Sequence, residues 1–247
     1  MDTNTTDFGY TQVPAGEKAG MVRAVFDSVA PKYDVMNDLM SLGLHRVWKR
    51  VFLNAIAPRA NETLLDLAAG TGDISLGALK LGMGRVISTD INAEMLTRGR
   101  DRATAAGRIN AMQFAVVDAE AIPLPDRSVD KVSIAFGLRN CTHKDAVLRE
   151  ARRVLKPGGR FFCLEFSRLE INALNPIYDA WSFKVLPRIG ARVANDADSY
   201  QYLAESIRTF PDQETLAAMC RDAGLERVSY RSLSGGVVAI HSGWRLA

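Results

Sequence analysis

The sequence has few cysteines, no long apolar run and no excess of charge of one sign, and each absence excludes a class of protein. Cys141, Cys163 and Cys220 are far apart and odd in number, which fits neither a disulfide framework nor a paired zinc spacing. No stretch approaches the roughly 20 apolar residues that span a bilayer. The 31 basic and 28 acidic residues are interspersed and leave a net charge of +3, so we expect no nucleic-acid partner.

The remaining composition is that of an ordinary globular protein. Of the 247 residues, 47% are hydrophobic and 24% charged, which is enough for one large domain with a substantial core. Residues 1–20 are polar, carry Pro14, Gly16 and Gly20, and have no apolar stretch for a signal peptide, so we expect a flexible N-terminus. We expect a cytoplasmic protein, with peripheral contact at the inner membrane left open.

Hydrophobic spacing divides the chain into a helical part and an alternating part. Between Met21 and Ile56, apolar residues recur every three or four positions, which predicts two or three helices. After Pro58, short β-rich runs alternate with helical stretches, the pattern of a parallel sheet with crossover helices. The predicted strands are 63–68, 85–90, 112–117, 130–136, 160–166, 227–233 and 237–244. Further helices are predicted over 175–206 and 212–223.

The last two predicted strands are joined by Ser234-Gly235-Gly236, which is too short for a parallel crossover and implies an antiparallel hairpin. A mostly parallel, seven-stranded α/β sheet that ends in one reversed hairpin strand resembles the Rossmann-like class I methyltransferase fold. We expect a single domain over residues 21–247. It would have a helical region on the substrate side at 21–57 and a helical insertion at 174–206.

A glycine-rich turn, from Asp66 to Asp73, follows the first predicted strand and opens a helix. Open α/β folds bind ligands at this edge of the sheet, and glycines let the backbone approach them closely. Gly70 and Gly72 begin a dinucleotide-binding GxGxxG pattern, but Ser75 replaces the third glycine. The negative charge of Asp73 would also sit badly beside a pyrophosphate. A cationic sulfonium with an amino-acid end fits better, and we assign Asp66, Gly70 and Gly72 to its site.

Two more aspartates follow the next two strands. Asp90 closes the second strand, where a carboxylate can accept hydrogen bonds from both ribose hydroxyls. Asp118 closes the third strand, where it can accept from an adenine amino group. A lone aspartate at a strand end is as often a turn former as a ligand, but three acidic positions at successive strand ends favour an adenosine site. The sequence therefore predicts S-adenosylmethionine as the cofactor.

At this point the chain resembles the UbiE/COQ5 family of C-methyltransferases, from about Lys18 to the C-terminus. Generic adenosylmethionine enzymes share only the glycine turn, whereas further motifs are specific to this family. In this sequence they are Tyr33-Asp34-Val35-Met36-Asn37-Asp38, Phe136-Gly137-Leu138-Arg139-Asn140, Leu164-Glu165-Phe166-Ser167, Leu186-Pro187-Arg188-Ile189-Gly190 and the stretch from Asn195 to Leu203. The resemblance implies methylation of a ring carbon of a prenylated quinol in ubiquinone or menaquinone biosynthesis.

The family's cofactor contacts fall on Thr71, Asp90, Asp118 and Ala119, which are all suitable residue types. One further position is commonly serine in bacterial relatives and is Ala135 here, so a hydroxyl contact is lost there.

Carbon methylation needs an electron-rich ring, and a phenol with a pKa near 10 must be helped toward its phenolate. Arg139 is assigned electrostatic stabilisation, and water held by Asn140 and Tyr33 is assigned proton removal. The alternative for Arg139 is a structural salt bridge to Asp145 or Glu150.

Several alternatives stay open at this stage. The chain could methylate another small molecule or a macromolecule, or act as a non-catalytic subunit of a quinone-synthesis complex. No metal is expected, because the three histidines are scattered and methyl transfer needs none. A prenylated quinol must be collected from a membrane or a partner protein, so both of these partners are considered, and a homodimer is left open. Two apolar stretches could line its path, one containing Met36 to Trp48 and one containing Tyr178 to Ile189.

Overall fold

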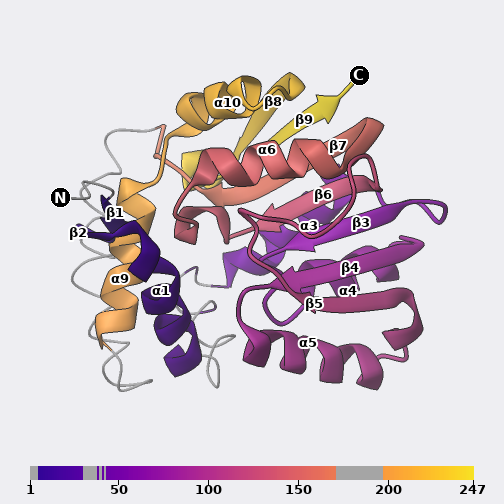
Figure 1. Ribbon diagram of the computed structural model, residues 1–247, viewed down its shortest axis with the longest axis horizontal. Coiled ribbons are helices and arrows are strands. Elements are labelled where there is room, and N and C mark those ends of the chain that lie inside the picture. Colours follow the sequence, from indigo (N-terminus) through magenta and orange to yellow (C-terminus); the bar gives the residue numbers. More distant parts are fainter. Residues whose placement is uncertain (1–4, 30–37, 39–40, 42, 171–196) are drawn as a thin grey trace.

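A seven-stranded sheet lies at the centre of the protein (Figure 1). The structure is a computed structural model, and it describes residues 5–29, 38, 41, 43–170 and 197–247. The strand order is β5-β4-β3-β6-β7-β9-β8. The strands are β3 (Thr63–Leu67), β4 (Arg85–Asp90), β5 (Met112–Val116), β6 (Val129–Ala135), β7 (Leu155–Phe166), β8 (Glu226–Leu233) and β9 (Val238–Arg245).

The direction of the strands confirms the predicted fold class. Strands β3 to β7 pair in parallel, whereas β9 runs antiparallel to both β7 and β8. The short connection at Ser234–Gly236 makes β8 and β9 antiparallel neighbours, and the reversed strand β9 lies between β7 and β8.

Helices cover both faces of the sheet, and alternate residues of β3 show how. Leu64 packs in one core cluster with Trp48 and Phe52 of α3, whereas Leu65 packs in another with residues of α6 and α10. This alternation follows from the two-residue period of a strand buried on both faces. The helices are α3 (Leu44–Ile56), α4 (Asp73–Lys80), α5 (Ala93–Ala105), α6 (Lys144–Val154) and α10 (Gln213–Asp222).

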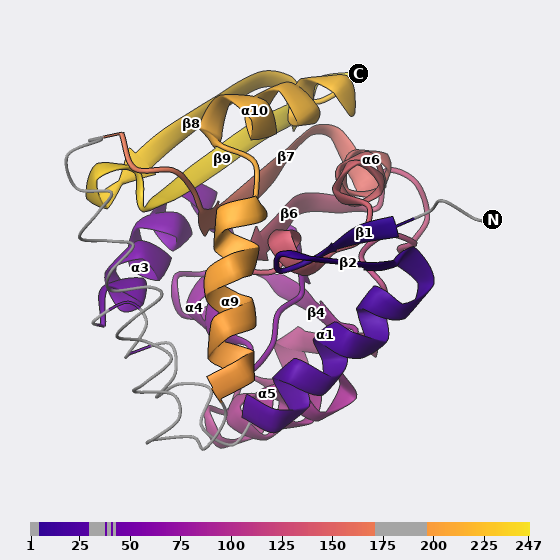
Figure 2. The ribbon, with the colours of Figure 1, turned by 90° about the vertical axis from the view of Figure 1, so that its left-hand side faces the viewer.

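A third group of elements lies across the end of the sheet toward which the parallel strands point (Figures 1 and 2). It consists of a hairpin of β1 (Thr5–Phe8) and β2 (Thr11–Pro14), α1 (Ala15–Val29) and α9 (Ala197–Thr209). The ring of Phe8 stacks on that of Tyr202, with centroids 4.2 Å apart, and the Tyr10 amide donates to Glu205 at 3.0 Å. The hairpin is therefore attached to α9 by apolar and polar contacts.

The structure differs here from the sequence prediction, which treated residues 1–20 as a flexible terminus and began the helical region at Met21. Residues 5–14 form the hairpin, and α1 already begins at Ala15. The short strands have little apolar alternation of their own, so their pairing depends on contact with α9. Most of the predicted insertion at 174–206 lies outside the described residues, and α9 contains its last part.

Strand β7 begins earlier than the predicted strand 160–166, because it also includes Lys156-Pro157-Gly158-Gly159. Leu155 pairs with Val129, and Arg160 pairs with Lys131. Residues 156–159 therefore form a bulge opposite a single residue of β6. Gly158 has φ +79° within this bulge. The turn-forming residues thus bend a strand instead of ending it.

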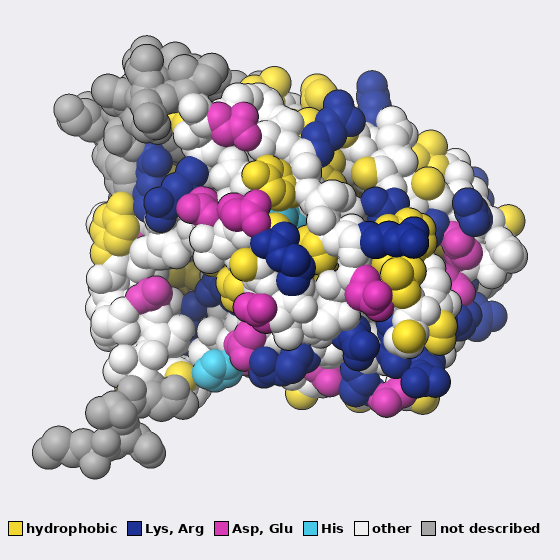
Figure 3. All heavy atoms as spheres, turned by 90° about the horizontal axis from the view of Figure 1, so that it is seen from above, with side chains coloured by type: hydrophobic (Ala, Val, Ile, Leu, Met, Phe, Trp, Pro, Cys, Tyr) yellow, Lys and Arg dark blue, Asp and Glu magenta, His cyan; other side chains and the backbone are white. Residues whose placement is uncertain are grey.

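Basic and acidic side chains are interspersed over the face shown in Figure 3. Within the described ranges, none of the helices has the length and apolar composition of a membrane span.

Candidate functional site

The glycine-rich loop joins β3 to α4 in a backbone conformation that needs its glycines. Gly70 and Gly72 have φ +56° and +81°, in the left-handed region that side chains disfavour. Gly99 of α5 packs directly against this loop, and a Cβ there would lie 3.3 Å from the carbonyl carbon of Thr71. The loop therefore lies close to α4 and α5, at the carboxyl ends of the parallel strands.

Asp90, at the end of β4, is fixed by that loop. One carboxylate oxygen accepts from the Gly70 amide at 2.8 Å, and the other accepts from the Asn92 amide at 2.9 Å. Burial raises the pKa of Asp90, and the two amide donors partly offset this. Each oxygen keeps a further lone pair, so the carboxylate is positioned to accept two more hydrogen bonds.

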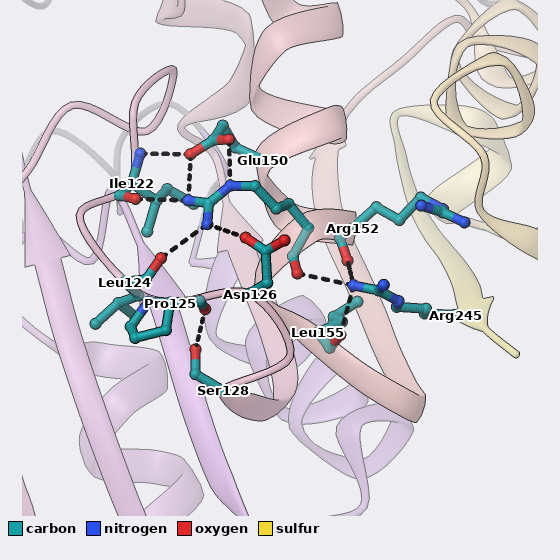
Figure 4. A network of polar contacts seen from close by, with 10 residues as sticks. Ile122, Leu124, Pro125, Asp126, Ser128, Glu150, Arg152, Leu155 and Arg245 are labelled. Carbon is teal, nitrogen blue, oxygen red and sulfur yellow. Dashed lines mark hydrogen bonds and ion pairs between the residues drawn. The ribbon is translucent and has the colours of Figure 1, made fainter. Parts of the chain in front are cut away.

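Asp118 and Ala119 follow β5, at the start of a segment anchored to α6. Asp118 accepts from the amide of Glu120 at 2.9 Å. Farther along, Arg153 donates to the carbonyls of Ile122 and Leu124, two residues that Figure 4 labels. The same guanidinium also pairs with Glu150 and Asp126. These bonds fix the segment at its far end and so help to position Asp118.

A cavity of about 430 Å³ lies along the ends of these strands. Of the predicted cofactor residues, Gly70, Asp90, Asp118 and Ala119 line it, and so does Asn140. Helix α1 forms the opposite wall, through residues that include Ala19, Val22 and Phe26. The sequence prediction missed this wall, because it contains no motif.

Three predicted residues are close to the large cavity without lining it. Thr71 accepts from Arg102 at 2.7 Å, and Gly72 is the N-cap of α4. Asp66 is 1% exposed and accepts from the hydroxyls of Ser75 and Ser133, both at 2.7 Å. Burial raises the pKa of Asp66 to about 6, against the opposing effect of these donors. The carboxyl group therefore ties the first turn of α4 to β3 and β6 of the sheet.

A second, smaller cavity of about 40 Å³ adjoins the first. The two share Phe26, Ala68, Ala135 and Phe136 as lining residues. Ala68 and Phe136 both have positive φ, +48° and +57°. Backbone of this kind in residues other than glycine is strained and is found disproportionately at functional sites.

Arg139 lines the smaller cavity and pairs with a residue that sequence reasoning did not assign. Its Nη1 donates to Oε1 of Glu165 at 2.9 Å, and its guanidinium lies over the ring of Phe166, 5.4 Å from the centroid. The alternative of a salt bridge to Asp145 or Glu150 is wrong, because these carboxylates pair with Arg149 and Arg153. A lone glutamate between buried Leu164 and Phe166 was the signal that could have identified the partner.

Asn140 lines a different cavity from Arg139. Asn140 borders the larger cavity, and its Oδ1 accepts from the hydroxyl of Tyr202 at 3.1 Å. Arg139 borders the smaller cavity, and Tyr33 lies outside the described residues.

Asp73, which argued against a dinucleotide, is neutralised by two cations. Lys49 of α3 lies 2.6 Å from one of its oxygens, and Arg102 of α5 lies 2.7 Å from the other. Burial alone would raise the pKa of Asp73, but these cations outweigh it and lower the pKa to about 2. Lys49, Asp73 and His45 all line the smaller cavity, and the sequence prediction included none of them as a site residue.

Comparison with known proteins now identifies the family. Residues 13–245 match the ubiE/COQ5 methyltransferase family. The chain belongs to this family. A relative from Acidiphilium cryptum, named ubiquinone/menaquinone biosynthesis C-methyltransferase UbiE, is 68% identical over 99% of this chain and 98% of its own. A relative of the same name from Methylococcus capsulatus is 55% identical over 99% of this chain and 100% of its own.

Solved structures share the fold at much lower identity. A methyltransferase from Thermotoga maritima matches with a TM-score of 0.62 at 18% identity, covering 90% of this chain and 98% of its own. A methyltransferase from Aquifex aeolicus matches with a TM-score of 0.55 at 18% identity, covering 80% and 89%. Both are described as dependent on S-adenosylmethionine.

The protein is an S-adenosylmethionine-dependent C-methyltransferase, as the sequence predicted. The large cavity fits this cofactor. It presents the fixed carboxylate of Asp90 for hydroxyl groups and the left-handed backbone at Gly70 for close approach. Apolar side chains of Met95 and Val117 border the same space and suit the faces of an adenine ring.

Proposed function

We propose that this protein methylates a ring carbon of a prenylated benzoquinol or naphthoquinol in ubiquinone and menaquinone biosynthesis. The names of the close relatives support this proposal, because they cover nearly the whole chain at 55% to 68% identity. The observation that carries it is the pair of adjoining cavities. One suits the cofactor, and the smaller one places aromatic and ionic groups beside the junction, where an edge of a quinol ring would enter.

The junction of the two cavities is where the ring and the methyl group would meet. Ala68, Ala135 and Phe136 border both spaces, at the ends of the neighbouring strands β3 and β6. Phe136 and Phe166 lie with centroids 5.0 Å apart, and Trp48, which lines neither cavity, supports Phe166 from 6.1 Å away. Such an aromatic wall binds a flat apolar ring and excludes water.

The cofactor supplies an electrophilic methyl group when bound, and the protein residues prepare the ring. Arg139 and Lys49 place two cations at the smaller cavity. Each is paired with a carboxylate, Glu165 or Asp73, so the ion pairs are fixed before substrate enters. A ring hydroxyl close to these cations would lose its proton more readily, because the cations favour the phenolate. Holding ring and methyl group in line supplies a further part of the rate acceleration.

The direct test is methylation of a reduced, short-chain prenylated quinol by purified protein with labelled S-adenosylmethionine. We expect one methyl group on a ring carbon, identified by mass spectrometry and NMR. Cells lacking this protein should accumulate a quinone lighter by one methyl group, and its ring identifies the natural substrate. Cofactor binding without turnover on any quinol would instead favour a non-catalytic role, and methylation only of other acceptors would favour a different substrate class.

The quinol tail must be delivered, and we propose that the protein collects it at the membrane surface. Leu44 and Val47 of α3 are 44% and 55% exposed, and the exposed Arg46, which pairs with Asp38, lies between them in sequence. Apolar and basic groups together on one helix suit an anionic bilayer. Flotation with anionic liposomes tests this contact, and a Leu44→Ser, Val47→Ser variant should lose the bound fraction. Chemical cross-linking in cells tests the alternatives, a quinone-synthesis complex or a homodimer.

A further inference from the structure

His45 of α3 is a buried titratable group that the mechanism above does not use. It is 8% exposed and lines the smaller cavity, which Arg139 lines as well. Its position gives the smaller cavity an imidazole in addition to the paired cations Lys49 and Arg139.

Among the described residues, the polar contacts of the His45 ring are made by Nδ1. Its Nδ1 lies 2.9 Å from the hydroxyl of Ser41 and 3.7 Å from a carboxylate oxygen of Asp38. The backbone amide of His45 donates to the same Ser41 hydroxyl at 3.2 Å. The negative charge of Asp38 near Nδ1 favours the tautomer that carries its proton there, with the Ser41 hydroxyl as the acceptor. Nε2 has no hydrogen bond within the described part of the chain, so its lone pair is free for a substrate.

The charges around His45 favour a neutral ring. Burial lowers the pKa of His45, Lys49 and Arg46 lower it further, and Asp38 and Asp73 oppose them. The other charged groups that border or face the smaller cavity are Asp66 of β3, Arg139 and its partner Glu165. An imidazole that is neutral at physiological pH can accept a proton.

We propose that Nε2 of His45 accepts the proton of the ring hydroxyl in the quinol methylation put forward above. The O–H bond breaks, its electron pair stays on the oxygen, and a new N–H bond forms at Nε2. After the adjacent ring carbon has gained the methyl group, its C–H proton leaves to solvent and restores the aromatic ring. His45 then returns its proton to the oxygen, so each turnover releases one proton.

This assignment separates proton removal from charge stabilisation. Arg139 is paired with Glu165 and stays protonated, so it favours the phenolate without taking the proton. Asn140 borders the larger cavity and bonds Tyr202, whereas His45 lies at the same cavity as Arg139.

The test compares His45→Gln, which cannot take up a proton, with His45→Ala and with Arg50→Gln, an exposed control on the same helix. General-base catalysis contributes about 10²-fold or more, so His45→Gln should lower kcat at pH 7 by roughly that factor. Its Kd for S-adenosylmethionine, from calorimetry, should stay within about twofold of wild type. Added imidazole should restore part of the turnover of His45→Ala, and Arg50→Gln should match wild type.

The pH profile gives an independent readout. Wild-type kcat should fall as the pH drops through the pKa of His45, which NMR titration of the imidazole measures in the protein without quinol. His45→Gln should lack this acidic limb. A variant that keeps the acidic limb, or turns over within about threefold of wild type, overturns the assignment. Wild-type protein that methylates no quinol at all would instead contradict the proposed function.

Discussion

Nη1 of Arg139 lies 2.9 Å from Oε1 of Glu165, and both side chains are buried to more than nine-tenths. A second Glu165 oxygen accepts from the Arg139 backbone amide at 3.3 Å. The pair therefore fixes both the guanidinium and the backbone of the segment that follows β6. Because a buried charge is tolerated only with a partner, each residue depends on the other.

Arg139→Ala should separate chemistry from cofactor binding. Arg139 lines the smaller cavity and not the larger one, so the Kd for S-adenosylmethionine should change by less than about threefold. The kcat with reduced quinol should fall by at least an order of magnitude, because a cation beside the ring hydroxyl is lost. Arg149→Ala, which removes an exposed arginine paired with Asp145, is the matched control. Unchanged turnover would remove Arg139 from the mechanism.

Glu165→Gln should act through Arg139. The amide keeps a similar shape but leaves the guanidinium with an uncompensated buried charge, so the free energy of unfolding should fall by about 3 kcal/mol. Urea denaturation measures this loss. If Glu165 positions Arg139, the double variant Arg139→Ala, Glu165→Gln should lose no more turnover than Arg139→Ala alone. Additive losses would mean that Glu165 acts independently.

Asp90→Asn should weaken cofactor binding while the fold persists. In the variant, the side-chain NH2 group must face one of two backbone N–H donors, that of Gly70 or that of Asn92. This N–H donor then loses its acceptor. Loss of charge-assisted hydrogen bonds to ribose costs about 1.5–3 kcal/mol, roughly a 10- to 150-fold rise in Kd. Calorimetry with S-adenosylmethionine measures it, with exposed Asp101→Asn as the control. An unaltered Kd would show that Asp90 serves only the loop.

Gly137→Ala should destabilise the junction of the two cavities. A Cβ at this position would lie 2.5 Å from that of Ala68, and both segments are held by the sheet. Overpacking of this kind costs about 1–3 kcal/mol. Gly20→Ala in α1, where a Cβ meets nothing within 4 Å, should be neutral or slightly stabilising. Thermal unfolding of both variants measures the contrast, and equal Tm values would contradict the close approach of β3 and β6.

Asp66 should make stability depend on pH. Burial raises its pKa to about 6, above the ordinary value of 3.8, so the folded state binds the proton more tightly than the unfolded state. Its contribution is complete below about pH 4 and is lost as the pH rises through 6, a change of about 3 kcal/mol. Asparagine at position 66 does not titrate. The unfolding free energy of wild type should therefore fall relative to that of Asp66→Asn, by about 3 kcal/mol, as the pH rises from 4 to 7. Urea denaturation across this range would show a constant difference if the pKa were ordinary.

Much of the fold could be predicted because its signals are local. The structure ends β4 at Asp90 and β8 at Leu233, the same residues that the sequence predicted. The reversed hairpin followed from the three-residue connection at Ser234–Gly236. The hairpin of β1 and β2 could not be predicted, since its pairing is supported by Tyr202 and Glu205 almost 200 residues away.

The candidate site divides in the same way. The residue types at Gly70, Asp90 and Asp118 predicted the cofactor, because their spacing along an alternating βα chain places them at one sheet edge. The sequence prediction did not pair Glu165 with Arg139, because the pairing joins the segment after β6 to the end of β7 across 26 residues.

The sequence by itself determined the fold class and the cofactor, and it predicted the acidic residues at the strand ends, because periodicity, turn chemistry and strand order depend on neighbouring residues. Only the tertiary structure decided which charges neutralise each other and which side chains share a cavity. Glu165 beside Arg139, Lys49 beside Asp73 and His45 at the same small cavity are brought together by packing of distant elements. Such contacts depend on how helices and strands dock in three dimensions, which no local pattern specifies.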